Sequence, residues 1–146
     1  MNWNWGLICG TVLVSITALC AGFGCYISCS AAVGAWKKCF LNNKPAPMML
    51  LAFIANPVTQ IFYAYILQGR ILAAAEANPD RMVIYVGLTI TSLVTLGVTS
   101  IMQGKVAAFC CDAMVETRKG FAQNMAAMGV LETTALFTMV FGVTIL

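Results

Sequence analysis

Four apolar stretches, each long enough to cross a lipid bilayer, make up most of this 146-residue chain. They cover residues 6–35, 46–69, 83–111 and 120–146. A transmembrane helix needs about 20 consecutive apolar residues, and a helix satisfies its backbone hydrogen bonds within itself, as the hydrocarbon layer requires. The sequence therefore predicts an all-α membrane protein with four transmembrane helices.

The composition excludes a soluble domain. Only 9% of the residues are charged and 61% are hydrophobic, whereas soluble domains contain about 25% charged residues. Among the basic residues, only Lys105 falls inside an apolar stretch, close enough to its end for the ammonium group to reach the headgroups. The formal net charge of +3 thus reflects the short connections and does not indicate a nucleic-acid partner.

The connections differ in charge, which predicts an orientation. Residues 36–45 contain three lysines, and the third connection contains Arg118 and Lys119. The second connection, residues 70–82, mixes two arginines with two acidic residues. Because basic loops stay in the cytoplasm, we expect a multi-pass plasma-membrane protein with connections one and three in the cytoplasm and both termini outside.

The same pattern, an apolar stretch, a basic connection and a second apolar stretch, occurs twice. Residues 59–63 (TQIFY) align with residues 133–137 (TTALF) in size and polarity, and internal repeats of this kind indicate duplicated units. In this register the first unit has no acid matching Glu132. We expect two transmembrane hairpins, residues 1–74 without the acid and residues 75–146 with it.

Glu132 is the only charged residue between Gly120 and Leu146, near the middle of the fourth stretch. An ionisable side chain at bilayer depth costs at least a few kcal/mol, so intramembrane acids are rare and usually lie on ion or proton paths. Such an acid needs polar partners from other helices.

Candidate partners lie on the second and third stretches. The second stretch carries four polar residues at positions i, i+3, i+4 and i+7: Asn56, Thr59, Gln60 and Tyr63. This spacing places them on one helical face. Counted from the third connection at 1.5 Å per residue, Gln103 and Glu132 lie at similar depths. We expect these side chains to meet in one layer of the membrane.

The chemistry of this set suits a hard cation. Thr59, Gln60, Gln103 and Glu132, with a backbone carbonyl near Pro57, offer only oxygen ligands, and one carboxylate neutralises one monovalent charge. Tyr63 can donate to the second carboxylate oxygen. Plain interhelical hydrogen bonds are the simpler alternative. A proton-only site would need little beyond Glu132, which favours Na⁺ because the other oxygens would then be surplus.

Two further features have structural interpretations. Pro57 lies inside the second stretch, where it removes a backbone donor and predicts a kink or loosened turn. Six of the seven cysteines fall within apolar stretches, and the sequence has no His and no CxxC motif. We therefore interpret the cysteines as small packing residues. Thr133 and Thr134 can bond back to their own helix.

Three segments together resemble the proteolipid K subunit (c subunit) of bacterial V-type ATPases: Pro57–Tyr63 (PVTQIFY), Gln103-Gly104 and Leu131–Thr133 (LET). The resemblance covers nearly the whole chain. It implies a ring of identical subunits that rotates against a stator membrane subunit and is joined to central stalk subunits. It also implies a non-catalytic subunit with no nucleotide site and no cofactor, embedded in the lipid bilayer and transporting Na⁺ or H⁺.

The resemblance also implies residue roles. In sodium-translocating members, the matching positions supply side-chain ligands at Thr59, Gln60, Gln103 and Glu132, a backbone carbonyl at Asn56, and a hydrogen bond to the acid from Tyr63. One departure lies near this set, because Asn56 replaces a residue that is usually apolar. Val58, where a small residue is expected, is another departure.

Three alternatives remain open from the sequence. The first is a ring subunit that carries only H⁺. The second is a small multidrug or cation antiporter, whose acid usually lies in the first helix and which would need an aromatic cavity, whereas residues 6–35 are rich in small residues that suit close packing. The third is a thiol-redox enzyme that uses Cys110 and Cys111.

Overall fold

The computed structural model describes residues 4–146, and within this range the backbone is helical apart from short connections. The α-helices are α1 (Trp5–Leu41), α2 (Leu50–Ile54), α3 (Thr59–Ala77), α4 (Met82–Thr117) and α5 (Phe121–Ile145). Two 3₁₀ turns, η1 (Asn56–Val58) and η2 (Pro79–Arg81), precede α3 and α4. Since α2, η1 and α3 form one rod, four helical segments are long and apolar enough to span a membrane, as predicted.

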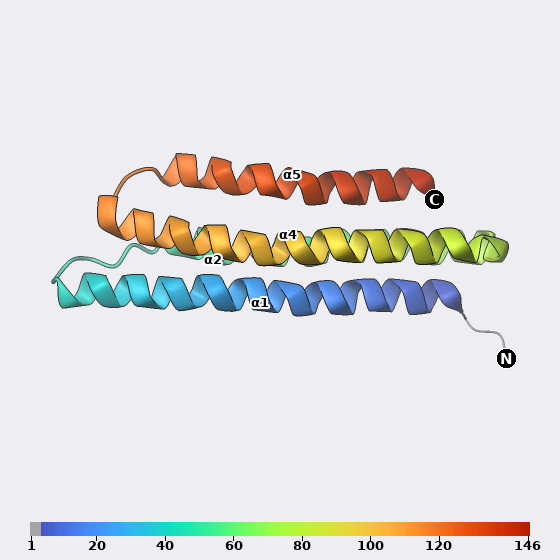
Figure 1. Cartoon of the computed structure of the whole chain (residues 1–146), viewed down its shortest axis with the longest axis horizontal. Coiled ribbons are helices and arrows are strands. Elements are labelled where there is room, and N and C mark those ends of the chain that lie inside the picture. Colours follow the sequence, from blue (N-terminus) through green and yellow to red (C-terminus); the bar gives the residue numbers. More distant parts are fainter. Residues whose placement is uncertain (1–3) are drawn as a thin grey trace.

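The four rods lie side by side in a bundle (Figure 1). The start of α1 and the end of α5 lie at one end, and the connections that follow α1 and α4 lie at the other, here called the connection end. Helix α1 packs mainly on α4 and also on α3, while α5 packs on α4 and α3. This arrangement places α5, which carries Glu132, beside both helices that carry its predicted partners.

Helices α1 and α4 are longer than the apolar stretches that predict them. They contain 37 and 36 residues, which corresponds to roughly 55 Å, against about 30 Å for the hydrocarbon layer. The predicted second connection, residues 70–82, is wrong in extent, because α3 continues to Ala77 and only Asn78 and η2 separate it from α4. Ala, Arg and Glu are good helix formers, so the helix extends beyond the apolar residues.

Helices α1 and α4 approach each other at glycines. A Cβ added to Gly24 would lie 2.5 Å from the backbone oxygen of Ser100, and one added to Gly104 would overlap the backbone of Gly24. Residues of this size allow the two backbones to touch, which is how membrane helices gain packing contacts without a hydrophobic driving force. Gly24, one of the small residues of the first stretch, therefore allows α4 to pack closely against α1.

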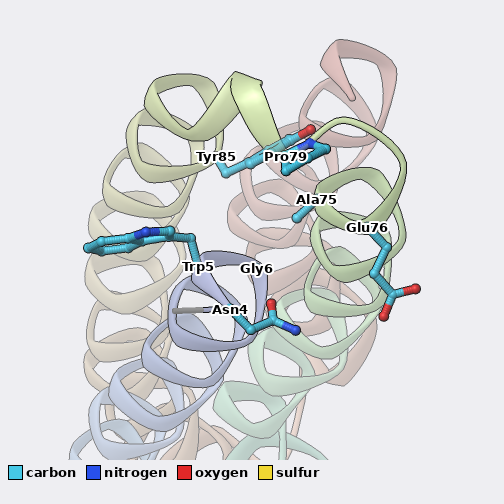
Figure 2. Close-up of a pocket in the computed structure, with 7 residues that line it drawn as sticks. All are labelled: Asn4, Trp5, Gly6, Ala75, Glu76, Pro79 and Tyr85. Carbon is cyan, nitrogen blue, oxygen red and sulfur yellow. The ribbon is translucent and has the colours of Figure 1, made fainter. Parts of the chain in front are cut away.

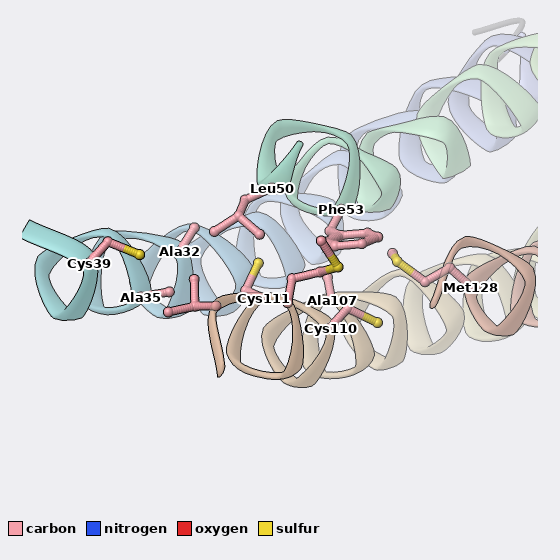
Figure 3. Packing of buried hydrophobic residues seen from close by; sticks show 11 residues of the cluster. Ala32, Ala35, Cys39, Leu50, Phe53, Ala107, Cys110, Cys111 and Met128 are labelled. Carbon is pink, nitrogen blue, oxygen red and sulfur yellow. The ribbon is translucent and has the colours of Figure 1, made fainter. Parts of the chain in front are cut away.

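The core near the connection end is rich in sulfur and small side chains (Figure 3). Phe53 of α2 packs on Phe121 of α5 with ring centroids 5.4 Å apart. Cys39, Cys110 and Cys111 are buried in the same cluster, and all seven cysteines of the chain are free thiols. This packing holds the start of α5 against α2, just before the helical break.

The break at Pro57 is confirmed. The α-helix stops at Ile54 and resumes at Thr59 after the 3₁₀ turn η1, and Pro57 itself is buried. The hydroxyl group of Ser100 donates a 2.9 Å hydrogen bond to the carbonyl oxygen of Pro57. A side chain from α4 thus stabilises the loosened backbone, as interrupted membrane helices require.

At the connection end, polar contacts join the two basic connections. Lys38 of α1 pairs with Asp112 of α4 at 2.7 Å, and this partner raises the pKa of the Lys38 ammonium group. The guanidinium group of Arg118 donates to the carbonyl oxygen of Pro45 at 2.7 Å. These groups are exposed, so the ion pair adds little stability. Its position marks the polar boundary of the bundle.

Candidate functional site

The candidate site lies where η1 and α3 face α4 and α5. Glu132 is near the middle of the 25-residue helix α5, and its side chain is half-buried against the bundle. Gln60 and Gln103, on α3 and α4, are completely buried. The i, i+3, i+4 spacing that begins at Asn56 survives the 3₁₀ turn, so the polar stripe of this rod faces the other two helices.

The carboxylate of Glu132 accepts hydrogen bonds from three side chains. Its Oε2 receives the hydroxyl of Thr59 at 3.0 Å and the amide Nε2 of Gln103 at 2.5 Å. Its Oε1 receives the hydroxyl of Tyr63 at 2.7 Å. Hydrogen bonds to an ionised acceptor are about twice as strong as neutral ones. The three donors contact both carboxylate oxygens, so this acid has polar partners at a depth where lipid offers none.

A second layer of contacts fixes the amide of Gln103. Its Oε1 accepts a 2.9 Å hydrogen bond from Gln60 Nε2, and its Nε2 also donates to Asn56 Oδ1 at 3.1 Å. The remaining amide oxygen, Gln60 Oε1, is buried and has no hydrogen-bond partner. Buried polar atoms without partners are rare, so this oxygen is an unused acceptor beside the site.

Asn56 contributes two oxygens. Its backbone oxygen accepts the hydroxyl of Thr59 at 2.8 Å, and its side-chain Oδ1 accepts from Gln103. Thr59 has a single hydroxyl hydrogen, so that hydrogen is shared between Asn56 O and Glu132 Oε2. Thr59 Oγ1 thereby links the 3₁₀ turn to the carboxylate.

The structure brings together all six residues proposed from the sequence: Asn56, Thr59, Gln60, Tyr63, Gln103 and Glu132. It does not bring in Thr133 or Thr134, whose hydroxyls donate to Val130 and Leu131 of their own helix. Sequence reasoning missed the contact of the Asn56 side chain with Gln103. The only available signal was the place of Asn56 at the head of the polar stripe.

An open groove of about 390 Å³ runs beside the carboxylate. Its lining residues come from the rod formed by α2, η1 and α3 and from α5: Ala52, Ala55, Asn56, Thr59, Met125, Gly129 and Glu132. On both sides of the groove, the residues with lower numbers lie nearer the connection end. The groove therefore extends from Glu132 toward that end. The small side chains of Ala55 and Gly129 leave Glu132 reachable from the outer surface.

A second cavity, of about 180 Å³, lies at the opposite end of the bundle (Figure 2). The Glu76 carboxylate there points away from Trp5 and Tyr85. The hydroxyl of Tyr85 donates to the carbonyl oxygens of Ala74 and Asn78, where it secures the end of α3. Its polar groups do not converge on one point, so this cavity is not a candidate binding site.

The site around Glu132 has only one carboxylate. Among residues 4–146, no three His, Cys, Asp or Glu side chains lie close enough together to hold a metal ion. The remaining oxygens come from amides, a hydroxyl and a backbone carbonyl. Neutral oxygens with a single negative charge match a hard monovalent cation better than a transition metal.

No family model matches the sequence, and no curated protein matches it. The assignment of a function to this chain therefore rests on the geometry around Glu132 and on the sequence motifs that surround it.

Proposed function

We propose that this chain is a rotor-ring proteolipid subunit of a V-type ATPase and that it carries Na⁺ on Glu132. The observation that carries the proposal is the setting of the Glu132 carboxylate. It lies at mid-helix in α5 and contacts Thr59, Tyr63 and Gln103 from two neighbouring helices. Acids at this depth with partners from several helices are typical of ion paths.

The site can present oxygens to a cation with little rearrangement. Gln103 directs Nε2 at Glu132 and Oε1 at Gln60. Because the two ends of an amide are nearly equal in size, turning the Gln103 amide over places an oxygen where the nitrogen lies. Its Nε2 is then available to Gln60 Oε1, the buried acceptor without a partner, once the Gln60 amide turns as well.

Rotation follows from the cost of charge in lipid. An ionised Glu132 cannot face the hydrocarbon layer cheaply, so the subunit enters the lipid only when Na⁺ or H⁺ neutralises the carboxylate. A cationic residue of a stator subunit would favour release of the ion. ATP hydrolysis would take place in a separate soluble head, and the connection end would face the central stalk in the cytoplasm.

A ring also fits the surface of α1. Leu19, Phe23 and Tyr26 are more than half exposed and line a groove of about 450 Å³ together with two small residues. Large apolar side chains that remain exposed mark contacts with lipid or with other chains. Neighbouring copies in a ring and the membrane would cover them.

An H⁺-carrying ring subunit is the second candidate. It is favoured by one observation, namely that no amide oxygen contacts Glu132: its partners are the Gln103 amide nitrogen and two hydroxyl groups, and a hydroxyl group can also accept a hydrogen bond from a protonated carboxyl group. Both candidates are subunits of a rotating ring, and they differ in the ion that Glu132 carries. They predict different responses of Glu132 to Na⁺.

Labelling with a hydrophobic carbodiimide distinguishes them. The reagent adds to a protonated carboxyl group and leaves a stable acylurea, which mass spectrometry detects on the intact chain. We expect Na⁺ to slow labelling of the detergent-solubilised protein, whereas K⁺ at the same ionic strength should not. The Glu132→Gln variant, which lacks the carboxyl group, should stay unlabelled. Labelling that depends on pH but not on Na⁺ would leave the H⁺ candidate.

A further inference from the structure

Asn56 is the one polar side chain of the site to which neither the sequence motifs nor the resemblance gives a role beyond its backbone carbonyl. It is half-buried in η1, and its Oδ1 contacts the Nε2 of Gln103 at 3.1 Å. That same nitrogen lies 2.5 Å from Glu132 Oε2. The Asn56 side-chain oxygen is therefore directed into the site and not toward the outer surface.

The nitrogen of Gln103 lies among acceptors. Asn56 Oδ1 and Glu132 Oε2 both accept hydrogen bonds from this nitrogen. Glu132 Oε2 also accepts a hydrogen bond from the hydroxyl group of Thr59. The amide NH₂ group of Gln103, which carries partial positive charge, is thus bound by one oxygen of η1 and one oxygen of α5. A monovalent cation in contact with Glu132 would meet the same pair of oxygens.

We propose that the Asn56 side-chain oxygen is a direct ligand of the transported Na⁺, so that Asn56 contributes both its backbone oxygen and its Oδ1. This inference rests on the proposed function. It identifies Asn56 as a residue that sets the preference for Na⁺ over H⁺. A proton is bound by the carboxylate alone, whereas each additional neutral oxygen improves the fit to a hard cation.

The position of Asn56 depends on the broken helix. Pro57 interrupts the α-helix immediately after Asn56, and Ser100 holds the carbonyl of Pro57. Because the turn is 3₁₀, both oxygens of Asn56 reach the side chains of the next turn, one at Thr59 and one at Gln103. The Asn56 carbonyl oxygen also accepts the backbone N–H of Thr59, three residues on, so the backbone and the side chain of Thr59 share this oxygen.

The test compares two variants of the protein, each with a side chain close to asparagine in size, in the carbodiimide assay. Asn56→Leu removes Oδ1 and keeps the backbone oxygen, and Asn56→Asp keeps an oxygen at the same place. Because aspartate adds a carboxyl group that the reagent can also modify, labelling is read on the peptide that contains Glu132. The matched control is Thr133→Val, next to Glu132 in sequence, whose hydroxyl bonds only to Val130. For each protein, the Na⁺ concentration that halves the labelling rate is measured, together with the pH of half-maximal labelling without Na⁺.

We expect Asn56→Leu to need roughly tenfold more Na⁺ for half protection, the effect of losing about one polar contact. Its labelling pH without Na⁺ should not change, because Gln103, Thr59 and Tyr63 still donate to Glu132. Asn56→Asp should be protected by Na⁺ at least as well as the unaltered chain, and Thr133→Val should match it.

Protection of Asn56→Leu at the unaltered Na⁺ concentration would overturn the inference while leaving Na⁺ transport intact. A parallel shift of the Na⁺ requirement and of the labelling pH would also overturn it, since that result indicates that Asn56 only positions Gln103. Equal losses in the Leu and Asp variants count against a ligand role as well. Absence of Na⁺ protection in the unaltered chain would instead remove the Na⁺ proposal itself.

Discussion

Thr59 links the backbone of the broken helix to the intramembrane acid through one hydroxyl group. Its Oγ1 contacts Asn56 O at 2.8 Å and Glu132 Oε2 at 3.0 Å. A side chain in this position serves either as a donor to the carboxylate or as an oxygen ligand beside it. In both cases it helps to make a charged group tolerable inside the membrane.

Thr59→Val tests this role, because valine keeps the shape of threonine and lacks the hydroxyl. We expect the Na⁺ concentration for half protection of Glu132 to rise by roughly tenfold, as for the loss of one polar contact. Thr134→Val is the control, since its hydroxyl donates only to Leu131. Unchanged protection in Thr59→Val would remove Thr59 from the site.

The residues of the site could be predicted from the sequence because spacing along a helix fixes which side chains share a face. Thr59, Gln60 and Tyr63 follow that rule. The contact between Asn56 Oδ1 and Gln103 could not be predicted, because it depends on the local geometry of a 3₁₀ turn. The direction of each Gln amide also depends on partners from other helices, which spacing on one helix does not specify.

At the scale of elements, the contact between α1 and α4 depends on the absence of side chains. Gly24 and Gly104 face each other with their backbones in contact, at the depth of Ser100, which holds the turn at Pro57. The closeness of these two helices therefore positions Gln103 on α4 relative to α3. Packing of α1, which contributes no residue to the site, thus supports the geometry around the acid.

Gly24→Ala tests this contact. The new Cβ would lie 2.5 Å from the backbone oxygen of Ser100, so α4 must move. Overpacking of this kind costs about 1–3 kcal/mol, and we expect a melting temperature in detergent several degrees below that of the unaltered chain. Gly34→Ala on the same helix is the control, because nothing lies within 4 Å of its added Cβ. Equal stability of the two variants would show that the close approach is not needed.

The helices themselves could be predicted from hydropathy, and their ends could not. The length of an apolar stretch matches the thickness of the hydrocarbon layer. A helix can continue past that layer, because its end depends on backbone hydrogen bonds and not on hydropathy. Arg70 and Glu76 thus belong to α3 and not to a connection. The break at Pro57 was predictable because proline lacks the backbone donor that an α-helix requires.

At the scale of the molecule, every long helix presents large apolar side chains outward. Tyr26 of α1, Phe62 of α3, Phe109 of α4 and Phe141 of α5 are each at least 60% exposed. A single chain with this surface is stable only in lipid or in contact with other chains. This exposed apolar surface fits a protein that spans a membrane with four helical segments.

The size of the complex that this chain forms separates a rotor subunit from an antiporter. The chain has a mass of 15.6 kDa, and an antiporter of two chains would weigh twice that. The measurement is native mass spectrometry of the protein purified in mild detergent, with Glu132→Gln as a second sample to test assembly apart from ion binding. We predict one closed complex of many copies, with the same copy number in both samples. A dimer would contradict the proposal that this chain carries its ion as part of a rotating ring.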